Sequence, residues 1–203
     1  MRAEAETADG RQPRRRRDPD KTREAIIDGL LAAVGEGDIE PTSREIAARA
    51  GTSVRSVFVH FADRETLLVA AMERQSAMVE DCLTEPDPTR PLAERIALAV
   101  AQSAAIFTLQ RTPRLAGLRE SRATPAIDTR MRRTDVRIRT SLATLFAPEL
   151  AAPDGTVDDE LLDLVDGTLA WPMRHHLQDR RELTADQAST TIERALWRLL
   201  AQR

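Results

Sequence analysis

Apolar residues recur at three- and four-residue spacing in almost every segment of this chain after residue 20. In the segment 21–37 they stand at positions 26, 27, 30, 31 and 34, and Gly35 and Gly37 follow. This period is that of one face of an α-helix, and the glycines mark its end. Alternating strand patterns, hairpin signals and internal repeats are lacking, and aromatic residues, which suit a β-core, make up only 3% of the chain. The pattern therefore predicts an all-α fold.

Several of the predicted helices begin at capping residues. Thr42 is followed by Glu45, and Thr184 by Gln187, which is the spacing at which a side chain and the backbone cap each other. Thr156 is the expected N-cap of the helix that follows it.

Prolines divide the second half of the chain. The segment 85–91 is expected to be a loop, and the segments 91–111 and 113–123 to be a helix and a separate short piece. Pro172 falls inside a predicted helix over 156–178. Because a proline ring removes a backbone hydrogen bond, this helix should be kinked.

Composition limits the classes of function. The chain carries 30 basic and 33 acidic residues, a formal net charge of −3, so an anionic partner has to be met by a local patch. Cys82 is the single cysteine, and one cysteine with three scattered histidines makes neither an intrachain disulfide nor a metal site. Nucleophile-elbow, zinc-protease and phosphate-loop motifs are lacking. We therefore expect no catalytic residues, no metal and no cofactor.

The chain is expected to be cytoplasmic. No uninterrupted run of about 18 apolar residues predicts a membrane span, and the N-terminus lacks the apolar core of a secretory signal. Residues 1–20 are polar and charged, which predicts a disordered tail. Its cluster Arg14–Arg17 is followed at once by Asp18 and Asp20. The cluster is either a solvated arm or an arm that lies against phosphates or enters a minor groove.

The stretch 42–61 combines two short helices with a tight turn. The helices are expected over 42–50 and 53–61, with Gly51 in the turn, and they follow the helix of segment 21–37 closely. Two such helices packed on a preceding helix form a helix-turn-helix, whose second helix enters the major groove of DNA. The alternative is an ordinary amphipathic helix within a bundle.

The second of these helices has two different faces. Val57, Phe58 and Phe61 are predicted to pack on the preceding helices. The opposite face, at the helix N-terminus, offers hydroxyls, a valine and an arginine, which suit phosphates, thymine methyl groups and base edges. These residues are Ser53, Val54, Arg55 and Ser56.

The sequence TSREIAARAGTSVRSVFVHFADRETLL, residues 42–68, resembles the DNA-binding segment of tetracycline-repressor-like (TetR family) regulators. The similarity includes the pair His60–Phe61 and Arg64, which lie outside a generic helix-turn-helix. The resemblance implies that one group of side chains meets the DNA backbone, namely Thr42, Ser43 and Arg44. It implies that a second group faces the major groove, namely Ser53, Val54, Arg55 and Ser56. A third group is implied to lie at the phosphate margin, namely Phe58, His60 and Arg64.

Three positions depart from the family pattern. Thr52 stands where valine or isoleucine is common, and Phe58 replaces a frequent tyrosine and so lacks its hydroxyl. Arg55 stands where a small residue is frequent, and a long side chain there has to meet different base edges. These departures leave the operator sequence open.

The resemblance also implies a division of the chain into a tail over 1–20, a three-helix DNA-binding domain over 21–66, and a helical ligand-binding and dimerisation domain over 67–203. Candidates for a ligand pocket are Phe107, Leu118, Arg122, Met131 and Trp171. The apolar candidates can instead be simple core, and Arg122 can instead belong to a solvated face.

Apolar stripes in the last two predicted helices suit a four-helix bundle made by two subunits. Packing within one chain is the alternative. The candidate interface residues are Leu161, Val165, Trp171, Ile192, Leu196 and Leu199.

Together these features predict a sequence-specific DNA-binding regulator of transcription. The expected form is a homodimeric repressor that a small-molecule ligand releases from a palindromic operator in double-stranded DNA. A DNA-binding regulator controlled by a protein partner, or by no ligand, is the alternative. An enzyme on a helical scaffold is the interpretation with the least support.

Overall fold

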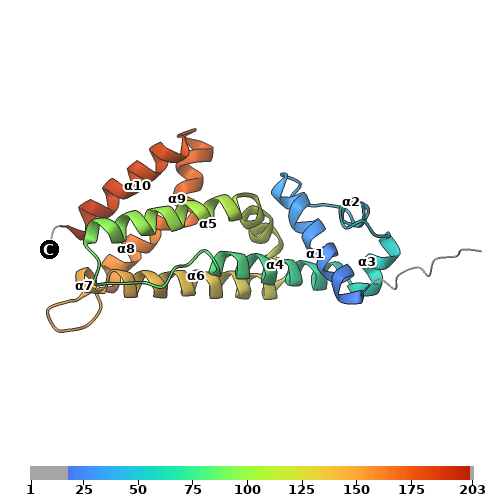
Figure 1. Cartoon of the computed structure of the whole chain (residues 1–203), viewed down its shortest axis with the longest axis horizontal. Helices are drawn as coiled ribbons and strands as arrows, with labels where there is room; N and C mark the ends of the chain where they lie inside the picture. Colours follow the sequence, from blue (N-terminus) through green and yellow to red (C-terminus); the bar gives the residue numbers. More distant parts are fainter. Residues whose placement is uncertain (1–17, 202–203) are drawn as a thin grey trace, which may run out of the picture.

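The computed structural model describes residues 18–201, and over these residues the protein is built from α-helices (Figure 1). The all-α prediction is confirmed. Within the described range, strand-like pairing is limited to one isolated antiparallel bridge between Ala151 and Val157. The elements are α1 (Pro19–Gly35), α2 (Ser43–Arg49), α3 (Val54–His60), α4 (Arg64–Glu80), α5 (Leu92–Glu120), α6 (Pro125–Leu145), α7 (Ala147–Leu150), α8 (Asp159–Leu169), α9 (Trp171–His175), the π-helical turn η1 (His176–Arg180) and α10 (Ala185–Leu200).

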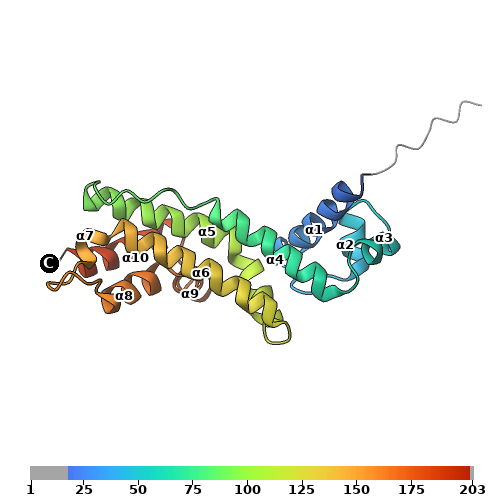
Figure 2. The same ribbon diagram turned by 90° about the horizontal axis from the view of Figure 1, so that it is seen from below.

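The helices form an elongated molecule with a small domain at one end (Figures 1 and 2). The helices α1, α2 and α3 lie at that end, and α4 runs from them into the body, where it packs on α6. The helices α5, α8, α9 and α10 form the rest of the body. The helix α3 is therefore separated from the body by the length of α4.

A core of aliphatic and phenyl side chains holds the small domain together. Leu67, Ala70 and Ala71 of α4 take part, so this core continues past residue 66, where the sequence suggested a boundary. At Gly29 of α1, an added Cβ would lie 3.0 Å from the carbonyl oxygen of Ile46 in α2. The close approach of the two helices thus depends on a glycine at this point. The other buried members are Ile26, Ile27, Leu30, Val34, Ile46, Ala47, Val57 and Phe61.

A second core fills the body, and it contains residues that the sequence analysis assigned to a dimer interface. Val165, Ile192 and Leu196 are fully buried within one chain, and Leu161 is nearly so. Leu199 packs at the edge of the same core. The residue assignment is therefore corrected, because side chains without solvent exposure cannot meet a second subunit. These apolar stripes pack against other helices of the same chain, which is the alternative interpretation of packing within one chain.

The helix α5 is long and apolar enough to cross a membrane by length and composition alone, with a mean hydropathy of 1.4 over 18 residues. In this fold it contacts α1, α4, α6, α8, α9 and α10. Its side chains Ile96, Ala99 and Val100 are buried in the body core. The apolar character of α5 is thus that of a core helix.

The sequence analysis wrongly divided α5 at Pro113. The helix continues through this proline to Glu120. Packing on both sides of the last two turns compensates for the missing backbone donor. Ala116 packs against the core of the small domain, and an added Cβ at Gly117 would lie 2.8 Å from the Met72 Cε atom of α4.

Two other predictions about helix ends need correction. Asp158, rather than Thr156, caps α8 by accepting a hydrogen bond from the Leu161 N–H at 2.9 Å. The Thr156 hydroxyl instead donates to Asp154 in the preceding turn. The predicted long helix also ends early: α8 stops at Leu169, Ala170 is extended, and Pro172 stands in the first turn of a separate helix, α9, where a proline lacks no helical hydrogen bond.

The capping boxes of Thr42 and Thr184 are confirmed at the starts of α2 and α10. At the N-terminus, the helix begins earlier than predicted. The Asp18 carboxylate caps α1 by accepting from the Asp20 N–H at 3.1 Å, so Pro19 and Asp20 belong to α1, with Asp18 as its N-cap. The cluster Arg14–Arg17 lies outside the described residues.

Candidate nucleic-acid interface and body cavity

The turn between α2 and α3 is set by Gly51, whose φ of +60° lies in the left-handed region. The Gly51 N–H donates to the Ala48 carbonyl at 3.2 Å, and the Thr52 N–H to the Ala47 carbonyl at 2.9 Å. These paired bonds form a Schellman motif, which stops α2 and fixes the direction in which the chain leaves it. The helix-turn-helix geometry predicted for 42–61 is confirmed.

The two faces of α3 differ as predicted, with one exception. Val57 and Phe61 are buried in the small-domain core. Phe58 was expected to pack with them, but 56% of its surface is exposed. Because Phe58 follows Val57 directly, it lies about 100° further around the helix and leaves the buried face.

The exposed surface of α3 is unusually apolar. Val54, Phe58 and Val59 are all exposed, and Val59 has the largest exposed fraction of the three, 72%. Arg55 lies among them, one turn before Val59. The sequence analysis missed Val59, although its position four residues after Arg55 placed it on the same face. This surface can meet thymine methyl groups and sugars as well as a base edge.

The hydroxyl groups at the helix starts are engaged in capping. The Ser53 hydroxyl accepts from the Ser56 N–H at 3.1 Å. The Thr42 hydroxyl donates to the Glu45 carboxylate at 2.6 Å. These hydroxyls therefore fix the helix starts first, and only their remaining lone pairs or protons can serve a phosphate.

The arginines of the small domain divide into free and engaged side chains. Arg44 and Arg55 form no hydrogen bond or ion pair within the described part of the chain. Arg49 forms a 2.6 Å ion pair with Glu36. The two free guanidinium groups are the strongest candidates for contacts with phosphate or guanine.

The structure places Arg64 differently from the resemblance. Its Nη1 atom donates to the carbonyl of Pro41 at 3.0 Å, and its Nη2 atom lies 3.9 Å from the Glu120 carboxylate at the end of α5. Arg64 thus joins the small domain to the body, and its guanidinium is engaged within the chain. Ser43 and His60 are half-buried, and Arg44 is exposed.

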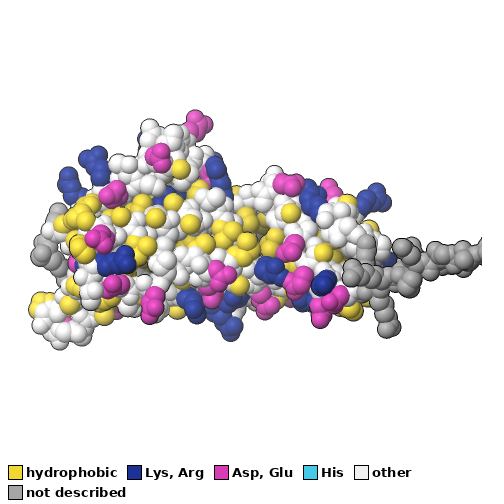
Figure 3. Space-filling view, in the orientation of Figure 1, with side chains coloured by type: hydrophobic (Ala, Val, Ile, Leu, Met, Phe, Trp, Pro, Cys, Tyr) yellow, Lys and Arg dark blue, Asp and Glu magenta, His cyan; other side chains and the backbone are white. Residues whose placement is uncertain are grey.

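The described part of the small domain does not form a basic surface. Between residues 18 and 66 the chain has six basic and ten acidic side chains, and Figure 3 shows both kinds interspersed over this end. Affinity for DNA must therefore come from a few well-placed arginines, together with any contribution from Arg14–Arg17.

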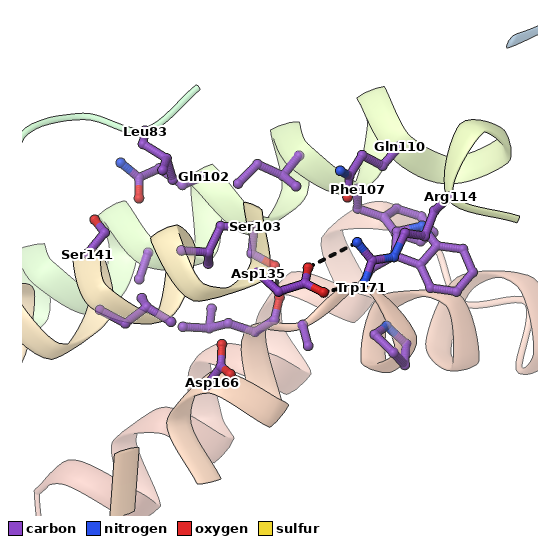
Figure 4. A pocket seen from close by; sticks show the side chains of 17 residues that line it. Leu83, Gln102, Ser103, Phe107, Gln110, Arg114, Asp135, Ser141, Asp166 and Trp171 are labelled. Carbon is purple, nitrogen blue, oxygen red and sulfur yellow. Dashed lines mark hydrogen bonds and ion pairs between the residues drawn. The ribbon is translucent and has the colours of Figure 1, made fainter. Parts of the chain in front are cut away.

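A cavity of about 290 Å³ lies in the body between α5, α6 and the α8–α9 junction (Figure 4). Of the predicted pocket residues, Phe107 and Trp171 line it. Leu118 and Arg122 are exposed at the far end of α5 and just after it, and Met131 lines a small gap beside α4 instead. Leu118, Arg122 and Met131 therefore do not line the cavity that Phe107 and Trp171 share.

Three charged side chains line this cavity, and the sequence analysis singled out none of them. Arg114 of α5 makes two hydrogen bonds to Asp135 of α6, at 3.0 and 2.7 Å. Asp166 of α8 forms no hydrogen bond or ion pair in the described chain. Burial is the largest cause that raises the pKa of Asp166 above its ordinary value. The negative charges of Asp135 and Asp163 also raise this pKa, and the positive charge of Arg139 lowers it. The sequence offered no signal for this cluster, since its members come from three separate helices.

A seam joins the end of α5 to the small domain. Arg119 forms a 2.6 Å ion pair with Glu40 in the loop before α2. The neighbouring Glu120 faces Arg64. Phe107 and Arg114, which line the cavity, precede these contacts on the same helix. The geometry therefore places one rigid element between the cavity and the helix-turn-helix.

Residues 26–71 match the family model described as bacterial regulatory proteins, tetR family. No curated protein sequence matches the chain significantly. Among solved structures, a transcriptional regulator from Rhodococcus sp. Rha1 is similar, with 17% identity, a TM-score of 0.68, and coverage of 91% of this chain and 96% of that one.

Two further structures share the fold. One, from Mesorhizobium loti, is described as a TetR-family transcriptional regulator, with 18% identity, a TM-score of 0.67, and coverage of 90% and 96%. The other is the multidrug binding protein EbrR complexed with imidazole, with 20% identity, a TM-score of 0.58, and coverage of 85% and 93%. Residues 26–71 therefore carry the helix-turn-helix segment of the tetR family of bacterial regulatory proteins, and the chain as a whole shares the helical fold of these solved structures.

Proposed function

We propose that this protein is a homodimeric repressor that binds a roughly palindromic operator through α3 and leaves it when a small molecule occupies the body cavity. The observation that carries the proposal is the cavity itself, which is lined by α5, the helix that also contacts the helix-turn-helix. A volume of about 290 Å³ is near the lower end for small-molecule sites. The similar EbrR structure is described as a multidrug binding protein.

Dimerisation is part of the proposal because one helix-turn-helix covers little DNA. Two copies on a two-fold axis would place their recognition helices about 34–36 Å apart, or a multiple of it, on a palindromic site. Exposed apolar side chains on α8 and α10, Leu164 and Trp197, offer a surface for this contact. Such a dimer would act in the cytoplasm, where its operator is accessible.

Release would follow from differential binding. A ligand changes DNA affinity only by its difference in affinity for the two shapes of the body, typically about 1–3 kcal/mol. The contacts of Arg119 with Glu40 and of Glu120 with Arg64 would transmit a shift of α5 to the small domain.

A gel shift of the purified protein with the DNA that flanks its own gene, repeated over a salt series, tests the proposal. Specific retention of one palindromic fragment with a two-subunit stoichiometry is expected. Binding of all fragments alike, or binding as a monomer, would contradict it. Deletion of residues 2–17 in the same assay measures what the Arg14–Arg17 arm contributes, through the change in the salt slope.

A further inference from the structure

The geometry assigns the body cavity to an organic cation with an aromatic body, with Asp166 as its counter-ion and with Phe107 and Trp171 as its aromatic wall. This inference rests on the proposed function, since it names the class of ligand for the same cavity. It follows from two observations: the charges that line the cavity and the aromatic wall.

The first observation is the balance of charge. Of the three charged side chains at the cavity, Arg114 and Asp135 neutralise each other through two hydrogen bonds. Figure 4 shows Asp166 on α8, apart from this pair. The cavity therefore carries one carboxylate that nothing in the described chain neutralises, and a cation is the ligand that would do so.

The other cations nearby are committed elsewhere. Arg139 pairs with Asp159 at 3.3 Å and with Asp163 at 2.5 Å. Arg174 is fully buried, but it does not line the cavity. Its guanidinium donates to the Ser103 hydroxyl at 2.7 Å, to the Val100 carbonyl at 2.8 Å, and to the Ser189 hydroxyl at 3.2 Å. Neither arginine thus forms an ion pair with Asp166; Arg139 acts on it only from a distance, and burial raises its pKa despite that charge.

The second observation is the aromatic wall. Trp171 and Phe107 lie with ring centroids 6.1 Å apart, and both line the cavity. His175 stacks on Trp171 at 4.6 Å and holds the indole in place. Aromatic faces attract cations, and they do so more strongly in a site from which water is excluded. The remaining walls are largely aliphatic, with Ile106, Ile138, Leu142 and Leu169, so the body of the ligand should be apolar.

Equilibrium dialysis of the full-length protein against three probes of one shape tests the assignment. The probes are 6-methoxy-1-methylquinolinium, the neutral 6-methoxy-1-methylnaphthalene and the anionic 6-methoxy-1-naphthoate. The cation is expected to bind at least about tenfold more tightly than either of the others, because a charge pair in a partly dry site is worth more than 1.4 kcal/mol. In Asp166→Asn this preference should fall several-fold, to what the aromatic wall alone supplies. The matched control Glu160→Gln, which removes an exposed carboxylate from the same helix, should keep it.

The aromatic wall is tested by Trp171→Leu, which keeps an apolar side chain and removes the ring. This variant should weaken the quinolinium cation several-fold and the neutral naphthalene less, because only the cation is attracted by the charge distribution of the ring face. Equal binding of all three probes, or a preference that Asp166→Asn leaves undiminished, would overturn the inference while the cavity remained a ligand site. Binding of none of them would also overturn it, and the gel shift on DNA would still report independently on the proposed regulator.

Discussion

The Nη2 atom of Arg119 lies 2.6 Å from a carboxylate oxygen of Glu40, so the last turn of α5 is joined to the loop before the helix-turn-helix. Both side chains are about half exposed, and such a pair contributes less than about 1 kcal/mol to stability. The pair would instead matter for coupling, because it links a movement of α5 to the position of the helix-turn-helix.

Arg119→Gln is expected to leave the melting temperature and the ligand-free operator affinity nearly unchanged. It should reduce, by up to about fivefold, the loss of operator affinity that the quinolinium probe causes, since at most about 1 kcal/mol passes through this pair. Operator titrations with and without the probe measure the effect. Arg132→Gln, which breaks an exposed pair with Asp128 within α6, serves as the control. If both variants respond like the parent, α5 does not act through Glu40.

Arg55→Ala and Arg44→Ala should weaken DNA binding in different ways. If Arg55 reads a base edge, its loss costs about 1–3 kcal/mol on the operator and little on unrelated DNA. If Arg44 meets a phosphate, its loss weakens all duplexes alike and lowers the salt slope by about one. Binding isotherms over a salt series distinguish the two. Arg49→Ala, in which the lost guanidinium was paired with Glu36, should leave the salt slope unchanged.

Gly29→Ala and Gly167→Ala should change stability in opposite directions. In α1, the added methyl group would meet the Ile46 carbonyl oxygen at 3.0 Å and the Ala50 nitrogen at 3.2 Å. Backbone atoms cannot easily yield, so a cost of roughly 1–3 kcal/mol should exceed the gain in helix propensity. Gly167 in α8 has nothing within 4 Å of an added Cβ, so alanine there should stabilise by up to about 1 kcal/mol. Urea unfolding of both variants checks the signs, and equal signs would contradict the close approach of α1 and α2.

Leu164→Glu and Leu196→Glu should separate assembly from folding. Leu164 is 55% exposed on α8, so a charge there should produce folded monomers that lose the palindromic operator. Leu196 is fully buried, and a charge there should unfold the body, at a cost of several kcal/mol. Sedimentation and circular dichroism measure the two properties. Val136→Glu, on an exposed site of α6, is the control for a surface charge. A dimeric Leu164→Glu protein would remove α8 from the proposed interface.

Stability should depend on pH through Asp166. Because burial raises the folded-state pKa of Asp166 above its ordinary value of 3.8, the unfolded chain loses this proton more readily than the folded one. Asp166 therefore adds to the free energy of unfolding when the pH is below its pKa in the unfolded chain. This contribution is lost as the pH rises through its pKa in the folded protein. Asp166→Asn should therefore be more stable than the parent at pH 7, and this difference should shrink as pH falls toward 4. A difference independent of pH would indicate another cause.

The sequence by itself determined the local parts of this protein. Helical periodicity predicted the all-α class, and the spacing of Thr42 with Glu45 and of Thr184 with Gln187 predicted two helix starts. Gly51 predicted the turn of the helix-turn-helix. These features follow from contacts within a few residues, so the sequence carries them directly.

Only the tertiary structure decided which helix or residue each face of an element contacts. An apolar stripe records that a face is buried, but it does not record by which partner, so the stripe with Leu196 suggested a second subunit when the same chain covers it. The continuation of α5 through Pro113 depends on neighbours from other helices. Arg64 was placed at DNA by its position in a motif, whereas the fold brings it to Pro41 and Glu120. Asp166, Asp135 and Trp171 come from different helices and meet at one cavity, because packing over long sequence distances, which no local pattern encodes, brings those helices together.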